Sequence, residues 1–190
     1  FTLSKKNITI DIDKVTGADS SILKNKNGMI IESVGDKFSY KLNLEYGKGA
    51  YWHCNNGKLY MGIEGEKQTT LYYSYTNMPT TGIINLNGKE IEVHGSTWFD
   101  KQGGNFNFMN THTHWEWFSM RFYDNEEIML FNFPQQNYCD GTYIKNNLTS
   151  SRLNNYTMKP IKFTEKNGYK FSCGWELKMP KIKDENYKII

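Results

Sequence analysis

The stretch TGIINLNGKEIEVHGSTWFD, residues 81–100, contains the strongest local signal for the fold. Two runs of alternating apolar and polar residues flank the dipeptide Asn87-Gly88. Both residues tolerate the positive φ values of the tight turns that join adjacent antiparallel strands. The stretch therefore predicts a β-hairpin with a two-residue turn.

Similar short segments recur on both sides of this hairpin at nearly even spacing. Turn formers such as Lys-Asn-Gly, Val-Gly-Asp and Asn-Asn-Gly separate them. The other expected strands are 8–13, 28–33, 37–46, 58–65, 69–76, 114–123, 127–133 and 141–145. A second tight turn is expected at Asp124-Asn125. Many short strands between turns predict an all-β fold, an antiparallel meander that forms a barrel or a sandwich.

Composition agrees with strands and limits the classes of function. Aromatic residues make up 15% of the 190 residues, and tyrosine and phenylalanine favour strands. The net charge of +3 is spread along the chain without a basic stripe, so we expect no nucleic-acid partner. No run of 18 apolar residues occurs, so we expect no membrane-spanning segment.

The three cysteines, Cys54, Cys139 and Cys173, show no CxxC spacing. This pattern argues against a disulfide framework and against a structural zinc site. The chain shows no signal peptide, but a mature or trimmed product would look the same, so the residues do not fix the localisation. They do not fix the oligomeric state either.

The chain changes character after residue 145. A polar, loop-like stretch over residues 145–160 precedes a strand-like pattern over residues 160–190. We therefore expect one β-domain over residues 1–150. Residues 151–190 are expected to be a linker followed by either the start of a second barrel or strands that close the first.

Residues 94–127 gather an unusual set of aromatic and titratable side chains. They hold three of the four histidines and three of the five tryptophans. Alternate side chains of a strand share a face, and both expected strands here mix aromatic and ionisable groups. The expected faces are His94, Ser96, Trp98 and Asp100 in one strand, and His114 with Glu116, opposite Trp115 and Trp117, in the other. Apolar walls with a few polar groups are typical of a ligand cavity, so we expect a small apolar molecule as partner.

A break over residues 101–113 separates these two strands. It contains Gly103-Gly104 and the apolar residues Phe106, Phe108 and Met109. A loop of this length is often a lid or a rim of a binding site. The alternative is a disordered surface loop.

The chain resembles a known family over about residues 50–135. The segments 69–104 and 114–133 are similar to the AttH-like and carotenoid 1,2-hydratase family, of the hydroxyneurosporene synthase type. The matching positions are Tyr72-Tyr73-Ser74, Gly82, Gly95, Trp98, Asp100, Gly104, Trp115, Trp117, Phe118 and Asp124. One position departs from the family pattern, because Gly103 stands where the family usually has tryptophan.

The resemblance implies a lipocalin-like antiparallel β-barrel, usually present as two tandem barrels, and no metal or organic cofactor. Residues 169–180 then resemble the opening strand of a second barrel. The family includes hydratases that protonate an isolated C=C bond. Many members have been called secreted hydrolases, so the resemblance implies a secreted or cell-envelope location.

On this basis Asp100 is the first candidate for a catalytic acid. Adding water to a C=C bond requires a proton donor beside an apolar wall, and desolvation favours the proton-bearing form of a carboxyl group. The alternative is that Asp100 caps a turn at residues 101–104. His114 and Glu116 either orient water or substrate, or face solvent at a barrel rim. The expected substrate-binding residues are His53, Tyr73, His94, Trp98, Trp115 and Trp117, with a surface role as the alternative for His53.

A metal site is the weaker interpretation of the histidines. His112 and His114 share a strand face and, with His94 or Glu116, have the donor atoms of a first-row metal site. A bare His-x-His pattern is weak, however, and the family offers no support, so we expect no metal. The sequence thus predicts a cofactor-free hydratase or cyclase, with a non-catalytic binding module for a hydrophobic ligand as the alternative.

Overall fold

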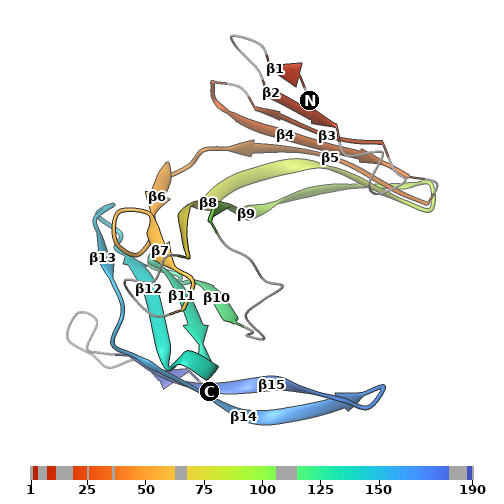
Figure 1. The fold of residues 1–190 in the computed structure, drawn as a ribbon. Coiled ribbons are helices and arrows are strands. Elements are labelled where there is room, and N and C mark those ends of the chain that lie inside the picture. Colours follow the sequence, from red (N-terminus) through yellow and green to blue (C-terminus); the bar gives the residue numbers. More distant parts are fainter. Residues whose placement is uncertain are drawn as a thin grey trace. The chain divides into compact units, whose positions relative to one another are not determined.

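The structure is a computed structural model that describes residues 2–3, 8–11, 19–24, 26–35, 37–62, 68–105, 115–179 and 188–189 (Figure 1). The regular elements of these residues are β-strands, apart from the 3-10 turn η2 (Pro134–Gln136). All strand pairs whose register is known are antiparallel. The prediction of an all-β antiparallel fold is therefore confirmed.

Within the described residues, the strands form three hydrogen-bonded sheets. The first contains β1 (Thr2–Leu3), β2 (Ile8–Asp11), β3 (Asp19–Lys24), β4 (Gly28–Val34), β5 (Phe38–Glu45), β6 (Ala50–Trp52), β7 (Lys58–Tyr60), β8 (Thr69–Leu86) and β9 (Lys89–Asn105). The second contains β10 (Glu116–Arg121), β11 (Glu127–Phe133), β12 (Tyr138–Ile144) and β13 (Ser150–Arg152). The third contains β14 (Thr157–Lys166), β15 (Tyr169–Lys178) and β16 (Lys188–Ile189).

The chain divides into two compact units. Unit 1 comprises Phe1–Tyr51 and Tyr73–Lys101, and unit 2 comprises Trp52–Tyr72 and Gln102–Ile190. The sequence predicts a β-domain over residues 1–150, followed by a linker and further strands over residues 151–190. The two compact units do not test this division, so it stays a prediction.

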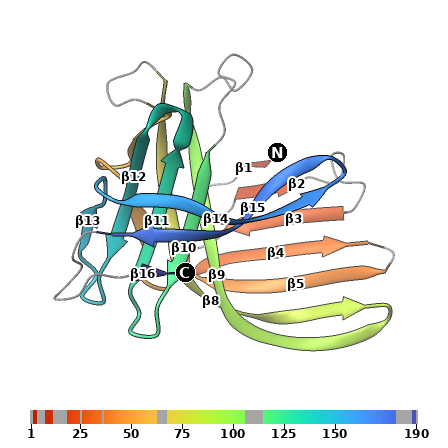
Figure 2. The same ribbon diagram turned by 90° about the horizontal axis from the view of Figure 1, so that it is seen from below.

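Strand β8 is the element to which most of the first sheet connects. Figure 2 shows its long hairpin with β9 beside β5. Along its other edge, residues 80–86 pair with β5 and residues 69–71 pair with β7. The sequence predicted two separate strands here, 69–76 and 81–86. The structure has one strand, because every second residue from Thr70 to Thr80 is buried and the alternation continues past Pro79.

Both tight turns predicted from the sequence are confirmed. Asn87 and Gly88 have φ values of 53° and 80°, and the Gly88 N–H donates to the Asn85 side-chain oxygen at 2.9 Å. Asn125 has a φ of 62°, and its N–H donates to the Phe122 carbonyl oxygen at 3.1 Å. These turns depend on adjacent residues only, which is why the sequence reveals them.

The predicted loop over residues 101–113 is wrong in its first part, because β9 continues to Asn105. Gly104 permits this continuation, since a Cβ atom there would lie only 2.4 Å from the carbonyl oxygen of Thr69. The glycine pair thus marks a close approach of two backbones rather than a break. Residues 106–114, with Phe106, Phe108, Met109, His112 and His114, lie outside the described residues.

One face of unit 1 is apolar. The register places Leu42 and Leu44 of β5 beside Ile31 and Met29 of β4. Met29, Leu44 and Met78 form a buried core cluster. The same face continues along β5 and β8 through the pairs Tyr40–Ile84 and Phe38–Leu86. We call the set Met29, Ile31, Phe38, Tyr40, Leu42, Leu44, Met78, Ile84 and Leu86 the apolar face of unit 1.

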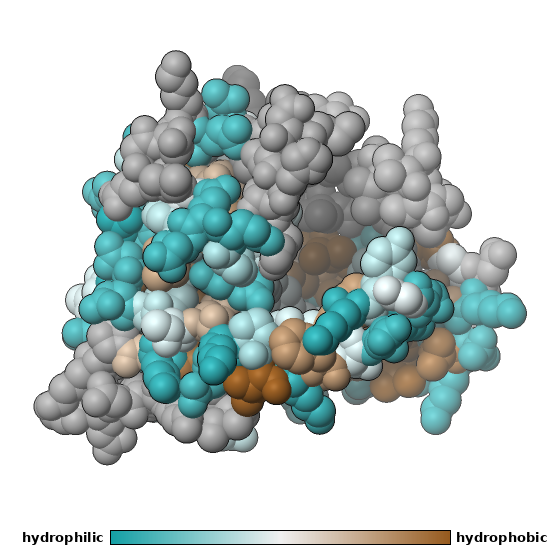
Figure 3. All heavy atoms as spheres, turned by 60° about the horizontal axis from the view of Figure 1, so that its bottom comes forward, coloured by the Kyte–Doolittle hydropathy of each residue, from teal (hydrophilic) through white to brown (hydrophobic). Residues whose placement is uncertain are grey.

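The opposite face of the same strands is more polar. Glu32 and Lys41 form an ion pair across β4 and β5, and Asn43 lies beside Thr81. This alternation is typical of an antiparallel sheet with one face turned toward apolar contacts. Elsewhere in the molecule, apolar residues are visible at the surface between hydrophilic ones (Figure 3). The side chains of Ile161, Phe163, Tyr169 and Phe171, on β14 and β15, are exposed apolar groups.

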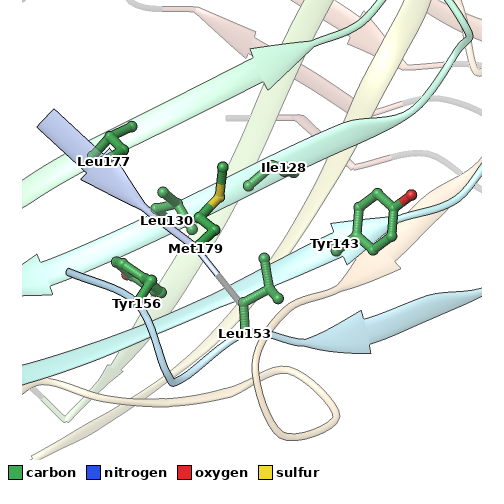
Figure 4. Packing of buried hydrophobic residues seen from close by; sticks show 7 residues of the cluster. All are labelled: Ile128, Leu130, Tyr143, Leu153, Tyr156, Leu177 and Met179. Atoms are coloured by element: carbon green, nitrogen blue, oxygen red, sulfur yellow. The ribbon is translucent and has the colours of Figure 1, made fainter. Parts of the chain in front are cut away.

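Unit 2 has its own hydrophobic core. Its buried members are Ile128, Leu130, Tyr143, Leu153, Tyr156, Leu177 and Met179 (Figure 4). Strand β11 is buried along nearly its whole length. The hydroxyl of Tyr156 donates toward the carbonyl oxygens of Phe131 and Asp140, each at 2.8 Å, and so ties the chain before β14 to β11 and β12.

The positive φ of Gly88 leads to a prediction about stability. Gly88→Ala should lower the free energy of unfolding by about 1–2 kcal/mol, because a Cβ atom is unfavourable in the left-handed region. Gly95→Ala in the same hairpin is the control, since Gly95 has open space around it and is absent from the positive-φ positions. Urea unfolding of both variants measures the difference. An equal loss of stability in the two variants would contradict the turn geometry.

Candidate functional site

Asp100 lies in β9 and has an exposed side chain. Its Oδ1 atom accepts a hydrogen bond from the indole Nε1–H of Trp98 at 2.8 Å. The same oxygen accepts a hydrogen bond from the hydroxyl of Ser74, which is fully buried. Because β9 continues to Asn105, Asp100 does not cap a turn at residues 101–104. Two uncharged donors from β8 and β9 instead hold its carboxyl group.

Aromatic rings surround Tyr75 in the same unit. The ring of Tyr46 stacks on Tyr75 with centroids 4.9 Å apart and an interplanar angle of 28°. Tyr73 meets Tyr75 edge-on at 6.1 Å and 82°, and Phe99 lies 6.2 Å from it. All four side chains are half-buried. We call Tyr46, Tyr73 and Tyr75 the tyrosine cluster.

The phenol groups of the cluster lie close enough to influence one another. Burial is the main cause that raises the pKa of Tyr46 and of Tyr75 above the ordinary tyrosine value. Repulsion from the neighbouring phenolate raises both pKa values further: Tyr75 and Tyr73 act on Tyr46, and Tyr73 acts on Tyr75. Two rings of the cluster, Tyr46 and Tyr75, pack against the core of Met29, Leu44 and Met78.

In unit 2, Trp117 belongs to a chain of aromatic contacts. Its indole Nε1–H donates to the hydroxyl oxygen of Tyr72 at 2.9 Å. The ring of Tyr72 packs against the imidazole of His53 with centroids 4.6 Å apart. His53 is fully buried, so the surface role considered for it from the sequence is wrong. Burial lowers the pKa of His53 to about 3, which keeps its imidazole neutral at ordinary pH.

Glu116 is held by partners from two other strands. Its Oε1 atom accepts a hydrogen bond from the indole of Trp175 at 3.0 Å. Its Oε2 atom accepts one from the side-chain amide of Asn132 at 2.7 Å. Glu116 is half-buried and joins β10 to β11 and β15, so it does not face solvent at a rim.

The remaining predicted residues take varied positions. Trp115 stacks on Phe131 at 6.1 Å and 18°, and both Trp115 and Trp117 remain more than one third exposed. His94 lies in β9 and is exposed. His114, with its neighbour His112, falls outside the described residues.

The predicted residues therefore form two groups. Asp100, Trp98, Tyr73 and His94 belong to unit 1. His53, Glu116, Trp115 and Trp117 belong to unit 2. Among the residues that the structure describes, no group of three or more potential metal ligands occurs.

Sequence reasoning missed several partners of these residues. Ser74 had a signal, because it lies on the alternating buried row of β8. Tyr46, Asn132 and Trp175 had none, since their contacts depend on pairing between distant segments. The sequence also gave no sign of the buried Asp140. Its carboxylate accepts hydrogen bonds from Nε–H and Nη2–H of Arg152 at 2.8–3.2 Å.

A polar hollow of about 220 Å³ lies in unit 2. It is lined by Asn132, Pro134, Asn137, Tyr138, Cys139, Tyr156, Thr157 and Met158. None of these side chains carries a formal charge at neutral pH. Asn132 lines the hollow and also donates its side-chain amide to Glu116, so it connects the hollow with that carboxylate.

The fold places the chain among all-β proteins of the lipocalin-like class, as comparison with solved structures shows. A putative AttH protein from Nitrosomonas europaea has a TM-score of 0.77 and 17% identity, over 93% of this chain and 55% of that chain. Kievitone hydratase from Nectria haematococca has a TM-score of 0.64 and 20% identity, over 80% of this chain and 49% of that chain. This chain thus spans about half the length of either structure.

The family is shown by a direct match. The model of the AttH-like family matches residues 2–189, so the chain belongs to the AttH-like family. No curated protein matches the chain. The described residues contain no helix with the length and apolar character needed to cross a membrane.

The burial of His53 predicts how stability depends on pH. Its pKa of about 3 in the folded chain lies below the ordinary value of 6.5, so the unfolded chain binds one more proton between these pH values. Stability should therefore be lost as the pH falls below about 6.5, by about 1.4 kcal/mol per pH unit from this group.

His53→Phe keeps a ring against Tyr72 and should remove this contribution to the slope between pH 6.5 and 4. His94→Gln replaces an exposed histidine and is the control. Urea unfolding at a series of pH values measures both slopes. Identical slopes in wild type and His53→Phe would contradict the neutral, buried state of His53.

Proposed function

We propose that this chain binds an apolar, isoprenoid- or lipid-like small molecule at unit 1 and that Asp100 protonates a C=C bond of that molecule. The observation that carries the proposal is the setting of Asp100. Its carboxyl group is held by Trp98 and Ser74 beside the ring of Trp98. Trp98 supplies aromatic surface on the same face of β9 as Asp100. The apolar face of unit 1 lies on the other side of that strand, where Phe99 packs against Met29, Leu44 and Met78.

The proposed reaction is the addition of water. Protonated Asp100 donates its proton to one carbon of the double bond, and positive charge develops on the other carbon. The π face of Trp98 stabilises that charge. A water molecule then forms the C–O bond and returns a proton to the Asp100 carboxylate. The net reaction is hydration of the double bond. It requires no oxidant or reductant, so acid–base groups suffice for it.

Other predicted residues receive supporting roles in this proposal. Tyr73 packs edge-on against Tyr75 and supports the aromatic group on the face of β8 opposite Ser74. Glu116 positions Trp175 and Asn132 in unit 2, because both of its oxygens already accept hydrogen bonds from them. One solved structure with a similar fold is named a hydratase, which supports this reaction class.

A binding module without chemistry is the second candidate. The exposure of Asp100 favours it, because a general acid works best where solvent is excluded from its carboxyl group. In that case the apolar face and the aromatic rings serve affinity only. The two candidates differ in what they expect of Asp100, and one substitution separates them.

Asp100→Asn tests the acid. The probes are isoprenoid compounds with isolated double bonds, such as geranylgeraniol and squalene, incubated with the chain in H₂¹⁸O and analysed by mass spectrometry. The hydratase proposal predicts an added ¹⁸O-labelled water with wild type. It also predicts a rate about 10²–10⁴-fold lower with Asp100→Asn, since the substituted amide has no acidic proton to donate.

Asp124→Asn, at the exposed turn between β10 and β11, is the matched control and should keep the wild-type rate. Probe affinity should change little in Asp100→Asn, because buried apolar area provides most of the binding. Binding without labelled product in any sample would favour the module. Equal rates in wild type and Asp100→Asn would exclude Asp100 as the acid.

A further inference from the structure

The polar hollow of unit 2 belongs to neither the proposed acid site nor the apolar face of unit 1. All residues that line it lie in unit 2, whereas Asp100 and Trp98 lie in unit 1. Its volume of about 220 Å³ is below the roughly 300 Å³ at which pockets for drug-sized ligands begin. The hollow therefore suits a small molecule, about the size of a single sugar ring.

A row of side chains across three strands leads into the hollow. The register pairs Glu116 of β10 with Asn132 of β11, and Asn132 with Cys139 of β12. Directly opposite residues of antiparallel strands share a face, so these three side chains lie side by side on one face of the sheet. Ile128 and Leu130 of the apolar core lie on the same face of β11, four and two residues before Asn132. The row thus places polar groups where the apolar core of unit 2 ends.

Glu116 fixes the orientation of the Asn132 side-chain amide. Its carboxylate accepts hydrogen bonds from Nδ2–H of Asn132 at 2.7 Å and from Nε1–H of Trp175 at 3.0 Å. A carboxylate only accepts hydrogen bonds, so the amide nitrogen rather than the amide oxygen meets it. Asn132 lines the hollow, and Glu116 is not among the lining residues. The Oδ1 atom of Asn132 is therefore the acceptor that remains for a ligand, and a charge-assisted hydrogen bond holds it in place.

Two further polar groups of the lining are available to a ligand. Asn137 and Thr157 are exposed, and neither side chain has a hydrogen-bond partner in the part of the chain that the structure describes. The amide of Asn137 and the hydroxyl of Thr157 both donate and accept hydrogen bonds. By contrast, the hydroxyl groups of Tyr138 and Tyr156 already donate to Asp140 and to backbone carbonyl oxygens. The available groups are thus uncharged, and together they donate as well as accept.

The remaining lining limits the charge of the ligand. Pro134 and Met158 supply apolar surface. Burial raises the pKa of the Cys139 thiol, which stays neutral and donates toward the carbonyl oxygens of Asn154 and Tyr156 at 3.6 Å each. A charged ligand would lose hydration here without gaining an ion pair. Hydroxyl groups around the edge of a ring and C–H groups on its faces match this mixture of polar and apolar lining.

We propose that the polar hollow of unit 2 binds an uncharged monosaccharide, and that Asn132 accepts a hydrogen bond from one of its hydroxyl groups. Asn137 and Thr157 bond further hydroxyl groups at the rim, and Pro134 and Met158 contact the C–H surface of the sugar. The site is separate from the chemistry proposed for Asp100, so failure of one proposal leaves the other intact.

Saturation-transfer-difference NMR with the complete chain tests the binding. The probes are D-glucose, D-galactose, D-mannose and D-xylose, with tetrahydropyran as the matched ring that lacks hydroxyl groups. At least one sugar should bind saturably, with a dissociation constant on the order of a few millimolar. Tetrahydropyran should give no saturable signal, because it donates no hydrogen bond to Asn132. No saturable binding of any sugar, or equally tight binding of tetrahydropyran, would overturn the proposal.

A bulky side chain at the rim locates the site. Thr157→Trp fills the hollow from an exposed position of β14 and should weaken sugar binding at least about 10-fold. Thr164→Trp introduces the same ring at an exposed threonine of the same strand that does not line the hollow, and it should keep the wild-type affinity. Equal affinities in the two variants would show that the sugar binds elsewhere.

Asn132→Ala tests the acceptor. The variant should bind the sugar about 2- to 10-fold less tightly, the factor that one hydrogen bond contributes. The substitution also removes a partner of Glu116, so far-ultraviolet circular dichroism and thermal unfolding must verify the fold. Unchanged affinity in the folded variant would refute the role of Asn132. If the variant does not fold, the comparison of Thr157→Trp with Thr164→Trp decides the proposal alone.

Discussion

The two-residue alternation of β8 is the constraint on which the rest of the first sheet depends. Every second side chain from Thr70 to Thr80 is buried, and this row includes Tyr72, Ser74 and Met78. A shift of one residue would exchange the two faces of the strand and expose the whole row. The alternation thus fixes Tyr72 against His53, Ser74 against Asp100 and Met78 in the core of unit 1.

The sequence revealed those parts of the fold that adjacent residues determine. The turns at Asn87-Gly88 and Asp124-Asn125 follow from residues that tolerate positive φ. The same local reasoning separated residues 69–76 from residues 81–86 and placed a break at Gly103-Gly104, where the structure has continuous strands. Strand pairing outweighs local turn preference there, because Gly104 admits the close backbone of Thr69. The contacts of the candidate site likewise include some that nearby residues determine and some that depend on distant strands. The Trp98–Asp100 bond follows from a spacing of two, whereas Tyr46 meets Tyr75 only through the pairing of β5 with β8.

The two carboxyl groups proposed from the sequence have similar partners but different consequences. Asp100 and Glu116 each accept a hydrogen bond from a tryptophan indole and one from an uncharged polar side chain. Glu116 uses both oxygens to join three strands, which describes a structural link. Asp100 receives both of these bonds on Oδ1 and is exposed, which is compatible with contact to a ligand. The account therefore centres on unit 1. Trp98 and Asp100 share one face of β9 there, and Phe99 packs with Tyr46 and Tyr75 against the apolar core on the other face.

Photo-crosslinking with a farnesyl diazirine tests most directly whether unit 1 binds an apolar molecule. The chain is irradiated with increasing probe, digested, and the labelled peptides are identified by mass spectrometry. The account predicts saturable labelling of peptides from residues 38–46 and 73–100, which unlabelled farnesol suppresses. Labelling confined to peptides of unit 2, or labelling that never saturates, would contradict it.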